Sequence, residues 1–292
     1  MPQPRIALVT CAELPDLDPD DRLVIAPLAA RGIEAEPAVW DDPTVDWAGF
    51  DLVVLRDPWD YVARRDEFVA WARSVPRLLN PASVVEWNTH KGYLRELAAA
   101  GVPVVATQWL EPGDAFVLPA GAFVIKPAIS AGSKDTGLYT PEEATLARAH
   151  VERLLADGRT VMVQPYLEAV EDAGETALLY FAGPQGLRFS HAARKGPMLT
   201  GPDRGVEGLY VEEQISARVP SEAELEVGAL AVAAAPPGLL YARVDLIRGP
   251  EGSPVLIELE LTEPSLFLRT SDAAAARFAD AIAGAINELQ SA

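Results

Sequence analysis

Strand-like and helix-like patterns of apolar residues alternate at the start of the chain. Apolar runs at 5–10 and 51–56 predict two buried strands, and a helical stretch near 19–31, which ends at Gly32, lies between them. The order strand, helix, strand is typical of a parallel α/β lobe. In such sheets, ligands meet the loops that follow the carboxyl ends of the strands.

The loop after the second of these strands is rich in polar and aromatic residues. Because it follows the carboxyl end of a strand in the expected parallel sheet, we expect it to face a pocket. The alternative is a capped turn around a tryptophan that packs in the core. The residues expected at the pocket are Arg56, Asp57, Trp59, Asp60 and Tyr61.

The middle of the chain predicts a second lobe. A helix at 91–100 stops at Gly101, and a strand is expected at 103–106. Beyond this hinge, 122–139 has the pattern of a strand, a loop of small residues and another strand. The segment 144–155 has apolar positions at helical spacing.

The last part of the chain predicts antiparallel strands and two helices. Strands are expected at 160–170, 176–183, 186–196, 239–247 and 255–261. A helix is expected at 221–235, because Ser221 and Glu224 match a capping box, and another at 272–289. The chain is thus expected to divide into three segments, 1–88, 89–160 and 161–292.

The amino-acid composition and net charge exclude several classes of binding partner. Hydrophobic residues make up 49% of the 292-residue chain, enough for a substantial core. The formal net charge of −19 would repel nucleic-acid backbones and anionic membranes, so neither is expected as a partner. The single cysteine, Cys11, excludes an internal disulfide, and no apolar run approaches the roughly 20 residues of a membrane span. With no secretion signal at its start, the chain is expected to be cytoplasmic.

The apolar strand at 255–261 carries too many carboxylates for an ordinary core strand. Glu258 and Glu260 are two residues apart and therefore share one face of the strand. A half-exposed strand with a solvated acidic face would explain them. The other explanation is a divalent cation, since like charges this close repel and Mg²⁺ prefers oxygen ligands.

A neighbouring strand adds a third carboxylate. Arg243 and Asp245 share a face of the strand at 239–247, and Asp245 joins Glu258 and Glu260 if the two strands are adjacent. Arg243 could neutralise a substrate carboxylate or a transferring phosphoryl group. Alternatively, it simply pairs with the acids.

Two further groups of residues suggest anion binding. Lys126 ends an apolar strand before a loop containing Ser130, Gly132 and Ser133, where backbone amides could approach phosphate oxygens. A Gly-rich hairpin is the alternative, because the loop lacks the P-loop pattern. The second group consists of His191, Arg194 and Lys195, in which the histidine could equally be structural.

The ordered set Lys91, Lys126 with its loop, "QPYLE", "ARKG", "RVD" and "IELELTEP" resembles the ATP-grasp superfamily, in the style of glutathione synthetase and D-alanine:D-alanine ligase. The resemblance covers nearly the whole chain. It implies an N-terminal parallel α/β lobe on the substrate side (1–88), a small lobe with a phosphate-covering loop (89–160) and a C-terminal lobe with a magnesium site (161–292), with ATP between the last two.

The resemblance also implies roles for individual residues. Phosphates would meet Lys91, Lys126 and the loop carrying Ser130, Gly132 and Ser133, and adenine would meet Gln164, Tyr166 and Leu167. Four acids compete for the ribose: Glu168, Glu171, Asp172 and Glu175, of which Glu175 is preferred. Asp245, Glu258 and Glu260 would hold one or two Mg²⁺ ions, or Mn²⁺, although the family usually has Asn where this chain has Glu260. Arg243, Lys195 and Arg194 would act in catalysis.

The activity implied is ligation through an acyl phosphate: ATP phosphorylates a substrate carboxylate and an amine displaces phosphate. Several segments, including "VWDDPTVDW" and "RDPWDY", are similar to a group of short ATP-grasp enzymes of antibiotic pathways that includes D-cycloserine synthetases, which close O-ureido-D-serine into a ring. A small amino-acid-like substrate would then meet Arg56, Trp59, Asp60, Tyr61 and His191. An intermolecular ligase and a kinase-like phosphotransferase remain alternatives, and the family favours a homodimer.

Overall fold

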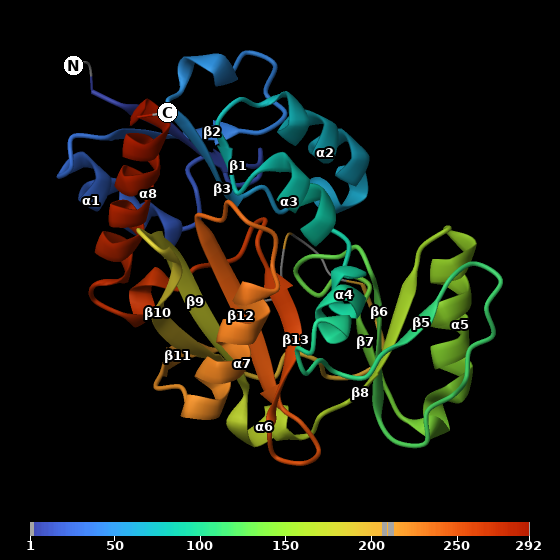
Figure 1. The fold of residues 1–292 in the computed structure, drawn as a ribbon. Coiled ribbons are helices and arrows are strands. Elements are labelled where there is room, and N and C mark those ends of the chain that lie inside the picture. The colour runs from blue at the N-terminus through green and yellow to red at the C-terminus, as the bar shows by residue number, and fades with distance from the viewer. Residues whose placement is uncertain (1–2, 206–208, 210–212, 292) are drawn as a thin grey trace.

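The computed structural model describes residues 3–205, 209 and 213–291, and these form three sheets with helices around them (Figure 1). The first sheet has the order β2-β1-β3-β4, and all its neighbouring strands are parallel. Its strands are β1 (Arg5–Thr10), β2 (Glu34–Val39), β3 (Leu52–Asp57) and β4 (Leu78–Leu79). The expectation of a parallel α/β lobe is confirmed.

Short helices connect these strands. They are η1 (Asp21–Val24), α1 (Ile25–Ala29), η2 (Trp47–Gly49), η3 (Tyr61–Arg64), α2 (Arg65–Ser74) and α3 (Ala82–Asn88). Strand β3 is buried along its whole length, as its apolar run predicts, whereas β2 lies at the edge and carries the exposed Glu34 and Pro37. Its sequence, EAEPAV, contains a proline and no apolar run, so its pattern predicted no strand.

The second sheet is antiparallel, with the order β5-β8-β6-β7. Its strands are β5 (Gln108–Leu110), β6 (Phe123–Pro127), β7 (Gly137–Tyr139) and β8 (Val161–Pro165). Helix α4 (Tyr93–Ala99) precedes the sheet, and η4 (Pro141–Glu143) leads into α5 (Ala144–Ala156), which packs against β6 and β8. Because β8 pairs with β6, this sheet continues to Pro165, beyond the boundary expected at residue 160.

The strand expected at 103–106 is not formed. Val104 makes only an isolated parallel bridge, to Leu256, so this segment runs alongside the edge strand of the third sheet. The hydrogen bonds from the Val105 N–H to the Leu256 carbonyl and from the Leu256 N–H to the Pro103 carbonyl fix that position. The connection between the two lobes is therefore pinned beside β13 (Pro254–Glu260).

The third sheet is antiparallel and has the order β11-β10-β9-β12-β13. Its other strands are β9 (Glu175–Gly183), β10 (Gly186–Lys195), β11 (Ile215–Arg218) and β12 (Tyr241–Arg248). The helices are α6 (Ala169–Ala173), α7 (Glu222–Ala233), η5 (Leu268–Thr270) and α8 (Ala274–Ser291). The expected capping box is present at the start of α7, where Ser221 and Glu224 bond reciprocally.

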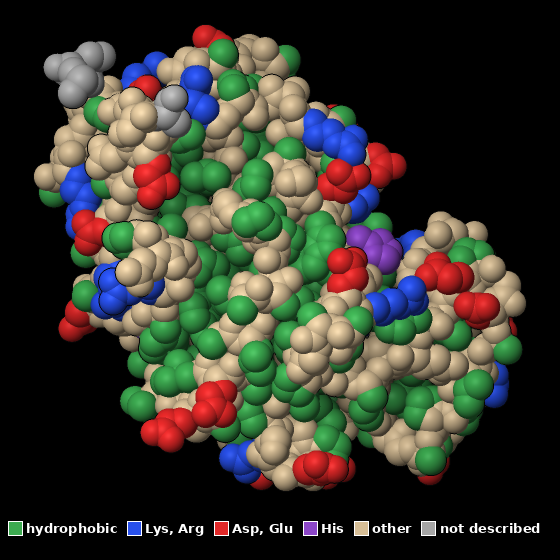
Figure 2. Space-filling model, viewed as in Figure 1, with side chains coloured by type: hydrophobic (Ala, Val, Ile, Leu, Met, Phe, Trp, Pro, Cys, Tyr) green, Lys and Arg blue, Asp and Glu red, His purple; other side chains and the backbone are tan. Residues whose placement is uncertain are grey.

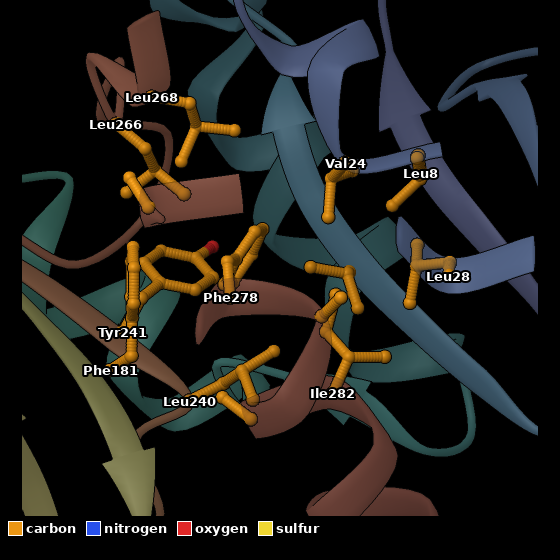
Figure 3. Packing of buried hydrophobic residues seen from close by; sticks show 14 of the residues in the cluster. Leu8, Val24, Leu28, Phe181, Leu240, Tyr241, Leu266, Leu268, Phe278 and Ile282 are labelled. Atoms are coloured by element: carbon orange, nitrogen blue, oxygen red, sulfur yellow. The ribbon is translucent and has the colours of Figure 1, made fainter. Parts of the chain in front are cut away.

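One apolar core joins the first and third sheets. Leu8 and Leu28 from the first lobe pack in the same cluster as Phe181 and Tyr241 from the third sheet, with Phe278 of α8 among them (Figure 3). Helix α8 lies against both α1 and β9 (Figure 1). This shared core sets the loops of the first lobe at a fixed distance from β12 and β13.

Charged side chains of both signs lie on the surface (Figure 2). On the face drawn in Figure 2, lysine and arginine are interspersed with aspartate and glutamate, and no basic patch is visible. Within the described ranges, no helix is both long enough and apolar enough to cross a membrane.

Candidate active site

A cavity of about 460 Å³ lies where the three sheets meet. Its walls combine an apolar end with a strongly charged end. The apolar end includes Val105, Val124, Leu167, Val170, Ile247 and Ile257, and the charged end includes Lys91, Lys126, Lys195, Arg243, Glu258, Glu260 and Glu263. A pocket of this size and chemistry suits a ligand with one apolar and one polyanionic part.

Three lysines from separate elements reach the charged end. Lys91 precedes α4, and its ammonium lies 3.0 Å from a Glu258 carboxylate oxygen and donates to the Ser130 carbonyl at 2.7 Å. Lys126 extends from β6, where burial and the neighbouring Lys91 and Lys195 charges lower its pKa, with Glu258 opposing them. Lys195 ends β10 and lies 3.1 Å from Glu175. Such a concentration of buried positive charge favours binding of an anion.

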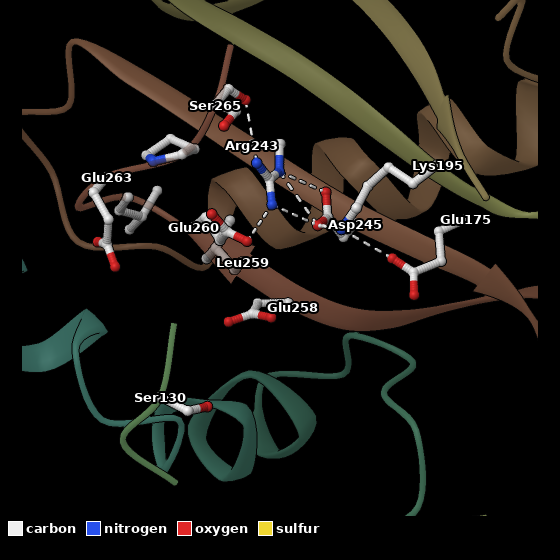
Figure 4. A network of polar contacts seen from close by, with 12 residues as sticks. Ser130, Glu175, Lys195, Arg243, Asp245, Glu258, Leu259, Glu260, Glu263 and Ser265 are labelled. Carbon is white, nitrogen blue, oxygen red and sulfur yellow. Dashed lines mark hydrogen bonds and ion pairs between the residues drawn. The ribbon is translucent and has the colours of Figure 1, made fainter. Parts of the chain in front are cut away.

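Strands β12 and β13 are adjacent, the condition for bringing the three carboxylates together, because Asp245 pairs with Glu258 and Arg243 with Glu260 across the two strands. Asp245 is fully buried between two cations: its carboxylate lies 2.8 Å from the Lys195 ammonium and 2.9 Å from Arg243 Nε (Figure 4). Against the cost of burial, these cations lower the pKa of Asp245. Glu260 forms an ion pair with Arg243.

These carboxylates do not form a ready-made three-acid metal site. Within the described part of the chain, no three acidic, histidine or cysteine side chains are grouped closely enough to hold an ion. Glu258 and Glu260 line the cavity, whereas Asp245 is enclosed by its two cations. Burial, together with Glu258 and Asp245, raises the pKa of Glu260 to about 8 against the opposing effect of Arg243. This crowding of carboxylates fits a Mg²⁺ ion bound by Glu258, Glu260 and nucleotide phosphates, the usual mixed coordination of magnesium.

The residues expected at adenine lie at the apolar end. Gln164, Tyr166 and Leu167 all line the cavity, and the Gln164 amide donates to the Thr107 hydroxyl at 2.9 Å. Of the four acids proposed for the ribose, Glu175 is among the cavity-lining residues. Glu171 accepts a hydrogen bond from the Tyr166 hydroxyl and is not among the residues that line the cavity.

The loop between β6 and β7 covers one side of the charged end. Ser130, Gly132 and Ser133 line the cavity, and Gly132 adopts a left-handed φ of 59° that suits glycine. At Gly137, the end of this loop, a Cβ would lie 2.6 Å from the Asp203 backbone nitrogen. The absence of a side chain there permits close packing.

The first-lobe residues that were predicted to contact a substrate divide into two groups. Trp59 and Tyr61 line the cavity. Arg56 does not: it is fully buried, with Nε 2.7 Å from Asp21, and it donates to the Pro264 carbonyl at 2.6 Å. Asp60 accepts a hydrogen bond from the Trp40 indole at 2.8 Å and borders a smaller adjoining hollow instead. Arg56 is thus a structural residue, which the strand-end rule does not distinguish from a binding residue.

The three basic residues on β10 also differ in whether they face the cavity. Successive strand residues point to opposite faces, so Lys195 enters the cavity while Arg194 turns away and donates to the Ala173 carbonyl at 3.0 Å. His191 is buried behind the cavity, where its Nε2 bonds the Leu266 carbonyl at 2.9 Å. Burial lowers the pKa of His191 to about 4, so it is neutral near pH 7. The structure therefore does not place Arg194 and His191 among the residues that can touch a ligand.

Several cavity residues had no predicted role. They include Asp18, Asp20, Glu263, Ser265 and Arg269. Glu263 lies three residues beyond the end of the acidic strand, and its carboxylate interacts with the Tyr61 hydroxyl. Burial is the main cause that raises the pKa of Glu263 to about 7. Its place as the third acid of the stretch 258–263, three residues after Glu260, was the only signal in the sequence.

Comparison with known proteins identifies the family. Residues 6–80 match the family described as D-cycloserine synthetase DcsG, N-terminal domain. The chain is 41% identical over 297 residues to the cycloserine biosynthesis protein DcsG of Streptomyces lavendulae, an alignment that covers 95% of this chain and 97% of that protein. The crystal structure of D-cycloserine synthetase DcsG superposes with a TM-score of 0.85 at 38% identity, covering 97% of this chain and 99% of the other.

A more distant structure has the same fold. The D-alanine–D-alanine ligase of Bacillus anthracis in complex with ATP has a TM-score of 0.63 at 15% identity, and the match covers 98% of each chain. The ATP-grasp resemblance and the fold class it implies are therefore confirmed, and the chain is an ATP-dependent ligase. By sequence and by structure, it belongs to the D-cycloserine synthetase family of ATP-grasp ligases.

Proposed function

We propose that this protein is a cyclo-ligase that uses Mg-ATP to close O-ureido-D-serine into D-cycloserine. The observation that carries the proposal is a single cavity in which Lys91, Lys126, Lys195 and Arg243 surround Glu258 and Glu260, within a chain of the D-cycloserine synthetase family. The apolar end accommodates adenine, the lysines receive the phosphates, and the first-lobe residues Trp59 and Tyr61 leave a compartment for a small amino acid.

The charged groups fit the two anions that must meet. Lys91 and Lys126 bind phosphate oxygens, and the loop with Ser130 and Gly132 covers them. Glu258 and Glu260 would hold one or two Mg²⁺ ions, for which Mn²⁺ would substitute, and a bound ion would offset the charge that develops on the phosphates. Arg243 faces the substrate carboxylate and stabilises the oxyanion formed when its carbon is attacked. Lys195 stays protonated, because Asp245 and Glu175 raise its pKa despite burial.

The reaction balances in three steps. A substrate carboxylate oxygen attacks the γ-phosphorus, and ADP leaves. The nitrogen bonded to the side-chain oxygen then attacks the acyl carbon and loses its proton, and phosphate leaves as the ring closes. Water finally removes the carbamoyl group from that nitrogen, which releases carbon dioxide and ammonia. Here the protein acts by holding both ends of one flexible molecule within bonding distance.

The test is product analysis by chromatography and mass spectrometry after incubation of purified protein with Mg-ATP and O-ureido-D-serine. D-cycloserine appearing with ADP and phosphate supports the proposal, and Lys126→Ala should abolish both products. A condensed product from two amino acids would indicate an intermolecular ligase. A persistent phosphorylated substrate would indicate a phosphotransferase, and either result would overturn the cyclo-ligase assignment.

We also propose that the protein is a homodimer in the cytoplasm, as the family resemblance favours. Size-exclusion chromatography with light scattering tests the assembly: a mass near twice that of the 31.3 kDa chain supports it, and a mass equal to the chain contradicts it.

A further inference from the structure

Five successive backbone carbonyls, from Thr262 to Leu266, each accept a hydrogen bond from a different side chain. In chain order the donors are Tyr241 Oη at 2.9 Å, Trp59 Nε1 at 3.0 Å, Arg56 Nη2 at 2.6 Å, Arg243 Nη1 at 3.2 Å and His191 Nε2 at 2.9 Å. Two donors come from the first lobe and three from the third sheet. We call residues 262–266 the clamped segment.

This arrangement fixes a stretch of chain that has no helix or strand to hold it. Each carbonyl that is bonded by a buried donor resists displacement, because breaking the bond would leave a polar group unsatisfied. The side chains within the segment are therefore held at set positions relative to β13, which ends two residues earlier. Of these, Glu263 and Ser265 line the cavity.

The Glu263 carboxylate differs from most other acids of the cavity in its partner. Glu258 pairs with Lys91, Glu260 with Arg243 and Glu175 with Lys195. Asp20 uses both oxygens on the backbone N–H groups of Leu268 and Arg269, at 2.6 and 2.8 Å. The partner of Glu263 is the uncharged hydroxyl of Tyr61, so no cation of this protein neutralises it by direct contact among the described interactions.

A view of the polar network shows where this carboxylate points. The carboxyl groups of Glu258 and Glu263 both extend into the space between the end of β13 and the loop carrying Ser130 (Figure 4). Glu263 is thus close to the acids that would bind the metal, yet it is separate from them. A cationic group on the ligand would supply the charge partner that the buried Glu263 carboxylate lacks.

The proposed substrate brings such a cation. Its carboxylate must lie beside Arg243 and the lysines to be phosphorylated, and its α-ammonium is on the adjacent carbon. Resting on the proposed function, we propose that Glu263, oriented by Tyr61 and by the clamped segment, binds the α-ammonium of the amino-acid substrate. Arg56 and His191, which do not reach the cavity, are then positioning residues for this contact.

The test compares two substrates in the wild type and in Glu263→Gln, a variant of nearly the same shape. For O-ureido-D-serine we expect KM to rise by about 10- to 100-fold, the effect of losing one charge-assisted hydrogen bond, with a smaller change in kcat. With the analogue that lacks the α-amino group, the two proteins should differ by less than about threefold. Equal penalties on both substrates would overturn the proposal.

Two further variants sharpen the assignment. Tyr61→Phe should raise KM for O-ureido-D-serine by about 3- to 10-fold, and this effect should shrink when Glu263 is already glutamine, because the two residues act together. Asp18→Asn removes another carboxylate that lines the same cavity. If the penalty that depends on the α-amino group appears in Asp18→Asn and not in Glu263→Gln, the ammonium site is at Asp18 and the proposal is wrong.

The outcomes separate this proposal from the proposed function. If the wild type does not convert O-ureido-D-serine, the cyclo-ligase assignment fails first, and the same comparison applies to whichever amino acid stimulates ADP release from a panel of amino acids with matched deamino analogues. If the wild type converts O-ureido-D-serine but Glu263→Gln has no selective penalty, only the ammonium site fails. ATP binding by calorimetry, expected within about twofold of wild type, checks that the variants are folded.

Discussion

Asp245 and Glu258 lie directly opposite each other on adjacent antiparallel strands, but they face different cations. Asp245 is held between Lys195 and Arg243, whereas Glu258 pairs with Lys91 and lines the cavity. Two acids that are equivalent in the sequence pattern therefore have different partners and surroundings in the structure. Asp245 holds Lys195 and Arg243 in place, and the Glu258 carboxylate lines the cavity, where the proposed metal would lie.

This difference predicts opposite phenotypes for two matched variants. Asp245→Asn should lower the free energy of unfolding by about 3 kcal/mol or more, because it leaves two buried cations without their partner. Glu258→Gln should cost less stability but raise the Mg²⁺ concentration needed for half-maximal ATP turnover by about tenfold or more. Urea unfolding and Mg²⁺ titration of turnover measure the two effects. A stable Asp245→Asn enzyme with a large Mg²⁺ requirement would restore Asp245 as a metal ligand.

Arg56 should affect stability more strongly than any exposed arginine nearby. It is fully buried with Asp21, so Arg56→Met leaves a buried carboxylate unpaired and should cost about 3–5 kcal/mol. Arg64→Met is the control, since Arg64 is 38% exposed where it meets Asp41 and should cost less than about 1 kcal/mol. Chemical denaturation of both variants gives the comparison. Equal costs would mean that burial of the Arg56–Asp21 pair does not make its loss more costly than that of an exposed pair.

His191 predicts a specific loss of stability in acid. Its pKa is about 4 in the folded protein and about 6.5 when unfolded, so the unfolded chain binds the proton first as the pH falls. The stability it contributes is present above pH 6.5 and is lost between about pH 6.5 and 4; at pH 5 the loss is about 2 kcal/mol. His191→Gln, which keeps an N–H donor, should lose about 2 kcal/mol less than wild type between pH 8 and 5. Parallel pH profiles for the two proteins would contradict the buried neutral histidine.

Two helical glycines should respond oppositely to alanine. A Cβ on Gly228 of α7 would lie 2.4 Å from the Tyr180 hydroxyl and 2.5 Å from a Leu178 methyl group, so Gly228→Ala should destabilise the protein by about 1–3 kcal/mol. Gly284 of α8 has open space around it, and Gly284→Ala should stabilise by about 0.5–1 kcal/mol. Thermal unfolding distinguishes them. Stabilisation by both substitutions would show that helix propensity outweighs the packing clash at Gly228, and destabilisation by Gly284→Ala would contradict the open space around Gly284.

Periodicity found most of the fold because most elements bury a continuous apolar face. Strand β3 and helix α8 have that pattern, and both lie where it predicts. The pattern did not predict edge strand β2, because EAEPAV contains no run of apolar residues. The segment at 103–106 has the composition of a strand, but it pairs only at Val104. Local pattern therefore identifies what is buried but not which partner buries it.

Alternation along a strand predicts which residues share a face, but not which face meets the cavity. Lys195 and Arg194 are adjacent, so one of them had to turn away from the cavity, but the sequence does not say which. Arg56 and His191 could not be assigned, since their partners are carbonyls of Pro264 and Leu266, far along the chain. Glu263 needed the same long-range information, because its partner is Tyr61.

The most direct test of the central claim is oxygen transfer from substrate to phosphate. Wild-type protein is incubated with Mg-ATP and O-ureido-D-serine that carries ¹⁸O in both carboxylate positions, and the released phosphate is analysed by mass spectrometry. The acyl-phosphate route predicts one ¹⁸O atom in each phosphate formed together with D-cycloserine. Phosphate without label would contradict it, because ATP would then have been cleaved by water and not by the substrate carboxylate.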